Sequence, residues 1–252
     1  MAHSRKVASL DAETIPGRKA ENRFFVGMSL LLPATVLVGF AKSYFLAGLI
    51  RARLPNELIH VHAVLFSCWI LLLIAQAAFI SSDRFDLHRK FGLFGFGLAC
   101  AMSVVGVTAA TDSLRRIRMV GSIDMRTFYA VPLFDVVVFA VLIFFAYRWR
   151  HDPATHKRLI LIASITIVDA ATGRDPLTRI TNVPYLNNVF TQLYTVLLAG
   201  FDLCSLKRIH RATLVAGLFS IGMLLAAIPV GSTAPWIAFA NWMLKIAKTI
   251  KG

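Results

Sequence analysis

The amino-acid sequence predicts an all-α fold, a polytopic helical bundle that spans a membrane. Its 252 residues are 57% hydrophobic and only 16% charged, whereas a soluble domain usually carries about 25% charged residues. Several apolar runs approach the ~20 residues that a helix needs to cross a bilayer. Because lipid offers the backbone no hydrogen-bond partners, each of these runs is expected to be helical.

About seven transmembrane helices are predicted, within one domain over residues 24–230. Their expected ranges are 24–48, 59–80, 89–111, 128–147, 157–173, 186–205 and 212–230. Residues 1–23 are polar and lack the apolar stretch of a cleavable signal peptide, so they are expected to form a cytoplasmic N-terminal segment.

Residues 231–252 are expected to form an amphipathic helix that lies in the membrane interface. Trp236, Phe239, Met243 and Ile246 recur at helical spacing, and the lysines of this segment fall elsewhere. The alternative is a frayed terminal tail.

Basic residues set the expected orientation. With the N-terminus inside, the inner segments hold more Lys and Arg than the outer ones, which predicts a multi-pass membrane protein with a cytoplasmic N-terminus. The outer loop DSLRRIRMVGSIDMR (residues 112–126) argues the other way. The net charge of +14 favours the lipid bilayer over nucleic acid as a partner, since no basic domain stands apart from the spans.

Three predicted inner loops carry similar sequences. They read DLHRKFG (residues 86–92), ATHKRLI (154–160) and KRIHRAT (207–213), and each places a histidine beside basic residues just before a span. This pattern favours three related hairpins after a lone first helix. The alternative is that loops on the inner side simply collect such residues.

Polar side chains are predicted at a similar depth in the outer half of the bundle. Ionisable groups inside a bilayer usually face the bundle interior, so this pattern is expected of a water-accessible pocket that opens outward. The expected pocket residues are Lys42, Tyr44, His60, His62, Trp69, Asp135, Thr166, Asp169, Asn188 and Gln192.

His60, His62, Asp135 and Asp169 are the candidate metal ligands of this pocket, and the two aspartates are also candidate catalytic groups. Imidazoles with carboxylates suit zinc, iron or manganese, with copper as a further element. On a helix His60 and His62 lie about 200° apart, so a shared pair requires the helix to begin only near His62. The alternative is an ion-pair network in which Lys42 or His62 neutralises an aspartate.

His88 and His156 begin two spans on the inner side. A bis-histidine haem needs two histidines on facing helices at one depth, which these two satisfy if their helices are neighbours. The alternative is a pair of headgroup-level residues beside Arg or Lys. Asp202, at the inner end of its span, is expected to pair with Lys207 or Arg208.

Four segments carry a resemblance to a known group of proteins. GFAKSYFL (39–46), HVHAVLFSCWILLLIAQ (60–76), DLHRKFG (86–92) and THKRLILIASITIVDAA (155–171) resemble an uncharacterised family of bacterial multi-pass inner-membrane proteins. That family has a His-x-His-Gly motif, and Ala63 replaces the glycine here. The histidines at span starts are also loosely similar to cytochrome-b-like membrane proteins, which implies a haem, although the paired histidines on four helices are missing.

Three functions follow from these observations. In the leading hypothesis the outward-facing pocket binds a metal ion or haem for redox or hydrolytic chemistry. In the second, Asp135, Asp169 and His62 form the relay of a proton or small-cation transporter. In the third, the chain is an accessory or assembly subunit of a membrane-protein complex and has no chemistry of its own.

Overall fold

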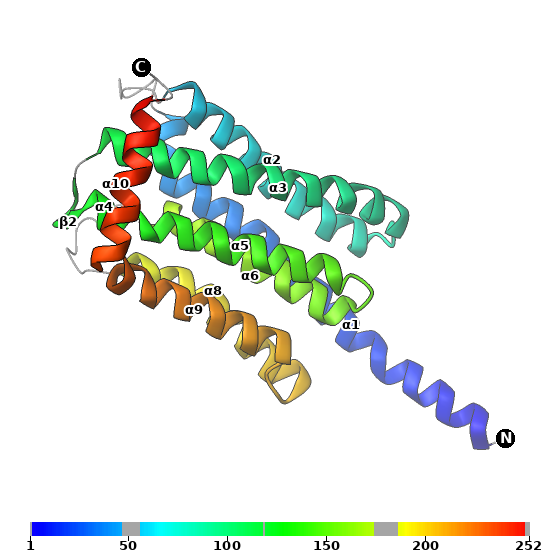
Figure 1. Cartoon of the computed structure of the whole chain (residues 1–252). Coiled ribbons are helices and arrows are strands. Elements are labelled where there is room, and N and C mark those ends of the chain that lie inside the picture. Colours follow the sequence, from blue (N-terminus) through cyan, green and yellow to red (C-terminus); the bar gives the residue numbers. More distant parts are fainter. Residues whose placement is uncertain (1, 47–55, 118, 174–185, 250–252) are drawn as a thin grey trace.

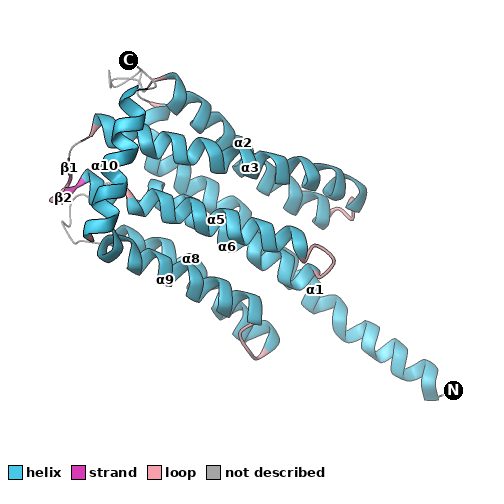
Figure 2. Ribbon diagram, viewed as in Figure 1, coloured by secondary structure: helices cyan, strands magenta, loops and turns pink. Residues whose placement is uncertain are grey.

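The structure of the protein, a computed structural model, describes residues 2–46, 56–117, 119–173 and 186–249, apart from the side chains of 2–18 and 186–189. Within these ranges the fold is all-α (Figure 2). The helices are α1 (Ala2–Phe40), α2 (Glu57–Ser81), α3 (Phe85–Arg116), α4 (Met125–Phe128), α5 (Ala130–Arg148), α6 (Pro153–Thr172), α8 (Leu186–Leu206), α9 (Arg211–Gly231) and α10 (Ala234–Thr249). A π-helical turn, η1 (Ala41–Phe45), follows α1, and a small hairpin of β1 (Met119–Val120) and β2 (Ile123–Asp124) precedes α4.

Three helical hairpins and one long helix make up the bundle (Figure 1). The hairpins α2–α3, α5–α6 and α8–α9 turn at the same end, and α5–α6 lies in the middle. Helix α1 packs against α2 and α6. We call the end with the three short turns the inner end and the opposite end the outer end, after the predicted orientation. This is the arrangement that the three similar loops favour.

Side-chain caps fix where three of the helices begin. Asn56, Asp152 and His210 precede α2, α6 and α9, and the side chain of each accepts a hydrogen bond from an N–H in the first turn. Pro153 follows the Asp152 cap at the first position of α6, where a missing N–H costs nothing. The helix starts are therefore set by local chemistry rather than by the change in hydropathy.

The helix bounds differ from the predicted spans mainly at their ends. The polar segment 1–23, predicted to precede the first span, is helical from Ala2 onward and continuous with it. Helix α2 begins at Glu57, two residues before the predicted start. Polar residues are compatible with a continuing helix, so a change from polar to apolar sequence does not mark a helix end.

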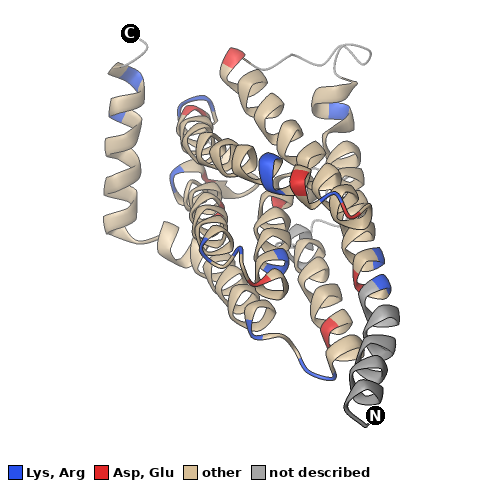
Figure 3. Ribbon diagram, turned by 90° about the vertical axis from the view of Figure 1, so that its right-hand side faces the viewer, with Lys and Arg blue, Asp and Glu red and all other residues tan. Residues whose placement is uncertain are grey.

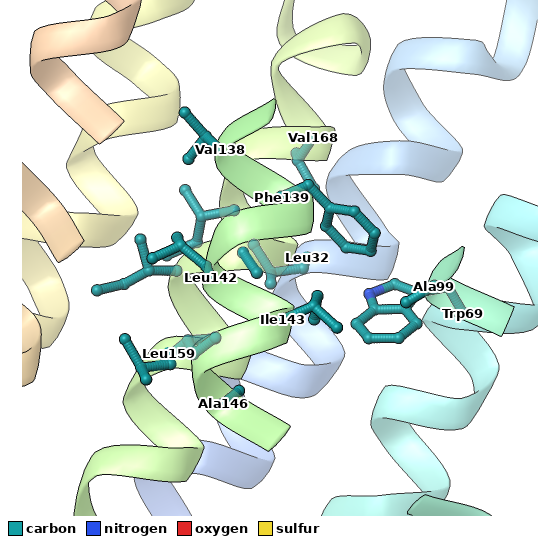
Figure 4. Packing of buried hydrophobic residues seen from close by; sticks show 14 of the residues in the cluster. Leu32, Trp69, Ala99, Val138, Phe139, Leu142, Ile143, Ala146, Leu159 and Val168 are labelled. Atoms are coloured by element: carbon teal, nitrogen blue, oxygen red, sulfur yellow. The ribbon is translucent and has the colours of Figure 1, made fainter. Parts of the chain in front are cut away.

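The hydrophobic core lies where α5 and α6 meet α1 and α2 (Figure 4). Leu32, Phe139 and Ile162 are at most 2% exposed. The Trp69 ring of α2 meets Phe139 edge-on with ring centroids 5.2 Å apart, and its Nε1 donates to Ser164 Oγ at 3.1 Å. The central hairpin is thus held to α2 by both packing and a buried hydrogen bond.

Five helical segments in the described part of the chain are long and apolar enough to cross a membrane. They are Lys19–Phe45, Glu57–Ser81, Phe85–Arg116, Met125–Arg148 and Arg211–Gly231. Large apolar side chains also cover the outside of the bundle, since Leu71, Val104 and Leu225 are 65%, 66% and 70% exposed. Most charged residues lie at helix ends and turns (Figure 3). This surface fits a multi-pass protein in a lipid bilayer.

Candidate functional site

A small polar cavity lies between α5, α6, α8 and α9. Its volume is about 10 Å³, which is room for about one water molecule. The lining residues are Asp135, Val138, Thr166, Asp169, Thr191, Gln192, Ser220 and Leu224. Six of these eight side chains carry oxygen, so the cavity is an oxygen-rich site within an apolar bundle.

Helix geometry brings two carboxyl groups to this cavity near the outer end. Asp135 lies in the second turn of α5 and Asp169 in the last turn of α6, and these two helices are antiparallel neighbours. Gln192 comes from the second turn of α8. Of the predicted pocket residues, the structure therefore brings together Asp135, Thr166, Asp169 and Gln192.

Threonine side chains hold the Asp169 carboxyl in place. Thr191 Oγ1 donates to Asp169 Oδ1 at 2.8 Å. Thr172 Oγ1 lies 2.8 Å from Thr191 Oγ1 and donates to the Asp169 carbonyl oxygen at 2.9 Å. Because Asp169 is only 6% exposed and Thr191 1%, this network orients a carboxyl group that is almost closed off from the outside.

Neither carboxyl is neutralised by a described cation. None of the ion pairs between described residues involves Asp135 or Asp169. Lys42, one of the two expected partners, is exposed, and the other, His62, does not line the cavity. The ion-pair network expected as the structural alternative is therefore not formed among these residues.

Two neutral oxygens of the cavity also have no hydrogen-bond partner in the described part of the chain. Ser220 is 3% exposed, and its hydroxyl makes no hydrogen bond there. Gln192 Oε1 is buried and unpartnered. Buried polar atoms are nearly always hydrogen-bonded, so these two oxygens are available to a bound molecule or ion.

The two histidines of α2 have different surroundings. Because α2 begins at Glu57, both lie on the helix and face directions about 200° apart. His60 Nδ1 lies 2.9 Å from the Tyr44 hydroxyl oxygen, whereas the His62 ring stacks on Phe66 with ring centroids 4.0 Å apart. A shared ligand pair required the helix to begin only near His62, and α2 does not meet that condition because it begins at Glu57.

The expected four-residue metal site is not assembled. Asp135 and Asp169 share the cavity, but His60 and His62 do not line it. Within the ranges that the structure describes, no three His, Cys, Asp or Glu side chains are grouped so as to hold a metal ion. The reason is that α2 packs against α1 and α3, away from the α8–α9 side of the bundle where the cavity lies.

Other predicted pocket residues lie elsewhere. Trp69 is buried in the core against Phe139. Tyr44 is half-buried in the π-helical turn beside His60. The side chain of Asn188 lies outside the described residues.

His88 and His156 meet at the inner end. Their rings are perpendicular with centroids 6.3 Å apart. His156 Nδ1 lies 2.8 Å from the carbonyl oxygen of Ala146, and the Gln76 amide, with its nitrogen turned toward His88, contacts His88 Nδ1. The structure therefore brings the two histidine rings together from α3 and α6, although α3 and α6 are not among the helix pairs with extensive contacts.

Asp202 pairs with a residue that the sequence did not suggest. Its partner is Arg158 of α6, and not Lys207 or Arg208 of the adjacent turn. Both side chains are fully buried. Sequence reasoning also missed Thr191 and Ser220; for Ser220 the available signal was a lone hydroxyl within an otherwise apolar run.

Comparisons with protein families, with characterised proteins and with solved structures found no match to this chain. The site must therefore be interpreted from its own chemistry.

Proposed function

We propose that the protein carries protons, or a small cation, and that the Asp135–Asp169 pair is its binding site. The observation behind the proposal is that two carboxyl groups share one small cavity while no described Lys, Arg or His pairs with either. Ionisable groups at membrane depth are costly, and they commonly mark the path of an ion or proton.

The unlike surroundings of the two carboxyl groups suit proton exchange. Asp169 accepts a hydrogen bond from Thr191, whereas no described residue donates to the Asp135 side chain. Two adjacent carboxylates repel each other, so such a pair is most stable with a proton or a cation between its members. Binding and release of that proton would be the elementary step of transport.

The cavity is proposed to exchange with the outer side. Toward the inner end, Ile162, Ile165 and Leu198 are 0% exposed, and close packing of such side chains leaves no room for water. The buried Arg158–Asp202 pair lies beyond them. This arrangement is that of a carrier whose site is closed toward the inner side.

The proposed setting is the bacterial inner membrane, crossed by seven helices (α1, α2, α3, α5, α6, α8 and α9), with the N-terminus in the cytoplasm. Helix α10 then lies in the outer interface. Its course across the outer ends of the other helices supports this placement (Figure 1). Trp236 Nε1 donates to the Arg126 carbonyl at 2.9 Å, while Trp242 is 56% exposed, as expected of an interfacial aromatic residue.

Proton flux in proteoliposomes tests the proposal. With a pH-sensitive dye inside and either a potassium diffusion potential or a Na⁺ gradient imposed, vesicles with the native protein should change internal pH faster than empty vesicles. The Asp135→Asn and Asp169→Asn variants should lose most of that flux. Asp86→Asn is the matched control, because Asp86 is 64% exposed beside Arg84 in the first turn of α3, at the inner end. Absence of flux under every imposed gradient, or equal flux in all variants, would overturn the proposal.

A second candidate function is binding of a metal ion or haem for redox chemistry, with His88 and His156 as ligands. The hydrogen bond from His156 Nδ1 to the Ala146 carbonyl is the kind that orients a ligating histidine so that Nε2 can bind the metal. The absorption spectrum and bound-metal content of the purified protein test it. The haem absorbance and the bound-metal content should both decrease in His88→Ala and His156→Ala. They should stay unchanged in His151→Ala, since His151 is exposed in the α5–α6 turn.

A further inference from the structure

We infer that the cavity takes a small alkali cation, of the Na⁺ or Li⁺ class, in competition with the proton. The inference rests on the proposed function, because it assigns a second ligand to the same Asp135–Asp169 pair. It goes beyond that function by naming the ion and the exchange stoichiometry.

The donor atoms of the cavity are those of a hard cation. Asp135 and Asp169 offer carboxylate oxygens, and the neutral oxygens come from Thr166, Thr191, Gln192 and Ser220. Among the described residues, no His, Cys, Lys or Arg lines the cavity. Sites with oxygen donors alone favour alkali and alkaline-earth ions over the softer transition metals, which prefer nitrogen and sulfur.

The unpartnered neutral oxygens point to a ligand other than the proton. A proton on a carboxyl group satisfies one oxygen, and it gives nothing to the buried Gln192 Oε1 or to the Ser220 hydroxyl. A cation at the centre of the cavity can be bound by both of these oxygens together with the carboxylates. This use of Ser220 accounts for a side chain that is 3% exposed yet makes no hydrogen bond within the described chain.

Size and charge narrow the choice of cation. A cavity of about 10 Å³ admits an ion only without its hydration shell, so protein oxygens must replace the lost water. Coulomb attraction to a carboxylate rises as the ion–oxygen distance shortens. A site with two carboxyl groups is therefore expected to prefer Na⁺ and Li⁺ to K⁺.

Charge balance gives the stoichiometry for a site that is neutral before the cation binds. With both carboxyl groups protonated the site is neutral, and one bound Na⁺ displaces one proton: the pair of acids plus Na⁺ gives one acid, one carboxylate with Na⁺, and H⁺. The remaining proton stays on the other carboxyl group. Each turnover would thus exchange one cation for one proton without net charge, and no redox step is involved.

Thermal stability of the purified full-length protein in detergent tests the inference. NaCl, LiCl, KCl and choline chloride are compared at constant ionic strength over pH 5.5–8.5. A ligand that binds only the folded state raises Tm steadily with the logarithm of its concentration above Kd. NaCl and LiCl should therefore raise Tm while KCl and choline chloride do not, and more NaCl should be needed as the pH falls, because protons compete.

Ser220→Ala is the informative variant, since removing an unpartnered hydroxyl breaks no hydrogen bond of the fold. It should raise the NaCl concentration needed for a given increase in Tm by roughly tenfold, as expected for loss of one polar contact to a charge. Ser103→Ala is the matched control, because Ser103 Oγ bonds only the Ala99 carbonyl within α3. Asp135→Asn should abolish the NaCl effect.

The results separate this inference from the proposed function. Equal Tm in all four salts at every pH, or a NaCl effect that Ser220→Ala and Asp135→Asn leave unchanged, would overturn the cation assignment. If proton flux then persists in the absence of Na⁺ and Li⁺, the proposed proton carrier is retained without the cation. Loss of both signals would remove both proposals.

Discussion

Arg158 and Asp202 form an ion pair in which neither side chain reaches the surface, at 1% and 0% exposed. Arg158 Nη2 lies 2.5 Å and Nε 3.0 Å from Asp202 Oδ1. The other carboxylate oxygen accepts from Thr213 Oγ1 at 2.5 Å and from the His210 backbone N–H at 3.1 Å. The pair therefore joins α6, α8 and the start of α9 at the inner end.

Removing one member of this pair should destabilise the protein strongly. Arg158→Met leaves a buried carboxylate without its cation, and the expected loss in free energy of unfolding is about 3–5 kcal/mol. Adding Asp202→Leu in the same chain should recover much of that loss, since no charge is then buried. Unfolding in detergent, followed by intrinsic fluorescence, measures both.

Arg84→Ala is the control for the buried pair. Arg84 and Asp86 are 59% and 64% exposed and their charged atoms are 3.9 Å apart, so its loss should change stability little. If Arg158→Met were as mild as Arg84→Ala, the Arg158–Asp202 pair would not be buried in the folded protein.

Trp69 should contribute to stability and not to the cavity. Trp69→Phe keeps most of the packing against Phe139 but loses the hydrogen bond to Ser164, and should cost about 1 kcal/mol. Trp69→Ala should cost about 3–5 kcal/mol, because it leaves a void in the core. Proton flux per folded molecule should stay at the native level in Trp69→Phe. A loss of proton flux with unchanged stability would instead indicate that Trp69 belongs to the cavity, as the sequence predicted.

Apolar run length predicted the helices well, because a helix in lipid must satisfy all its backbone hydrogen bonds and needs little else from the sequence. Helix ends were less predictable. The early start of α2 depends on the Asn56 cap, and that single residue decides that His60 and His62 lie on a helix. The two histidines therefore face different directions, while the packing of α2 on α1 and α3 keeps both away from the two aspartates.

For the candidate site, it was harder to predict which helices are neighbours than to predict the depth of each residue. Asp135, Asp169 and Gln192 could be grouped from depth alone, and the structure places them in one cavity. Depth could not show which helices are neighbours, and so His62 was grouped with them although α2 packs on α1 and α3. For the same reason Asp202 was paired with residues near in sequence, when its partner Arg158 lies on another helix.

The close approach of α1 and α6 should depend on Gly39. A Cβ at this position would lie 2.3 Å from the Ala171 carbonyl oxygen, and that contact is with backbone, which cannot turn aside. Gly39→Ala should therefore push the helices apart at a cost of about 1–3 kcal/mol. Gly97→Ala is the matched control, because a Cβ there meets nothing within 4 Å and alanine is the better helix former. Thermal unfolding of both variants checks this, and equal stability would show that α1 and α6 do not touch at Gly39.

His210 should make stability depend on pH near neutrality. Burial, followed by the positive charge of Arg158, lowers the pKa of His210 below its usual 6.5, so the folded protein favours the neutral ring. Its Nδ1 accepts the hydrogen bond from Ala212 N at 3.1 Å that caps α9, and a proton on that atom would remove the cap. The unfolded chain takes up the proton first, so the contribution of His210 is fully present above pH 6.5 and is lost as the pH falls toward the lowered pKa.

Replacing the imidazole with an amide isolates this contribution. His210→Asn keeps a capping side chain but does not titrate, so between pH 7.5 and 5 its Tm should fall less than that of the native protein. His151→Asn, in an exposed turn, should follow the native profile, while the cavity carboxyl groups titrate alike in all three proteins. Parallel profiles for His210→Asn and the native protein across this range would show that the His210 ring gains its proton equally well in the folded and unfolded chain, and the neutral cap at α9 would have to be abandoned.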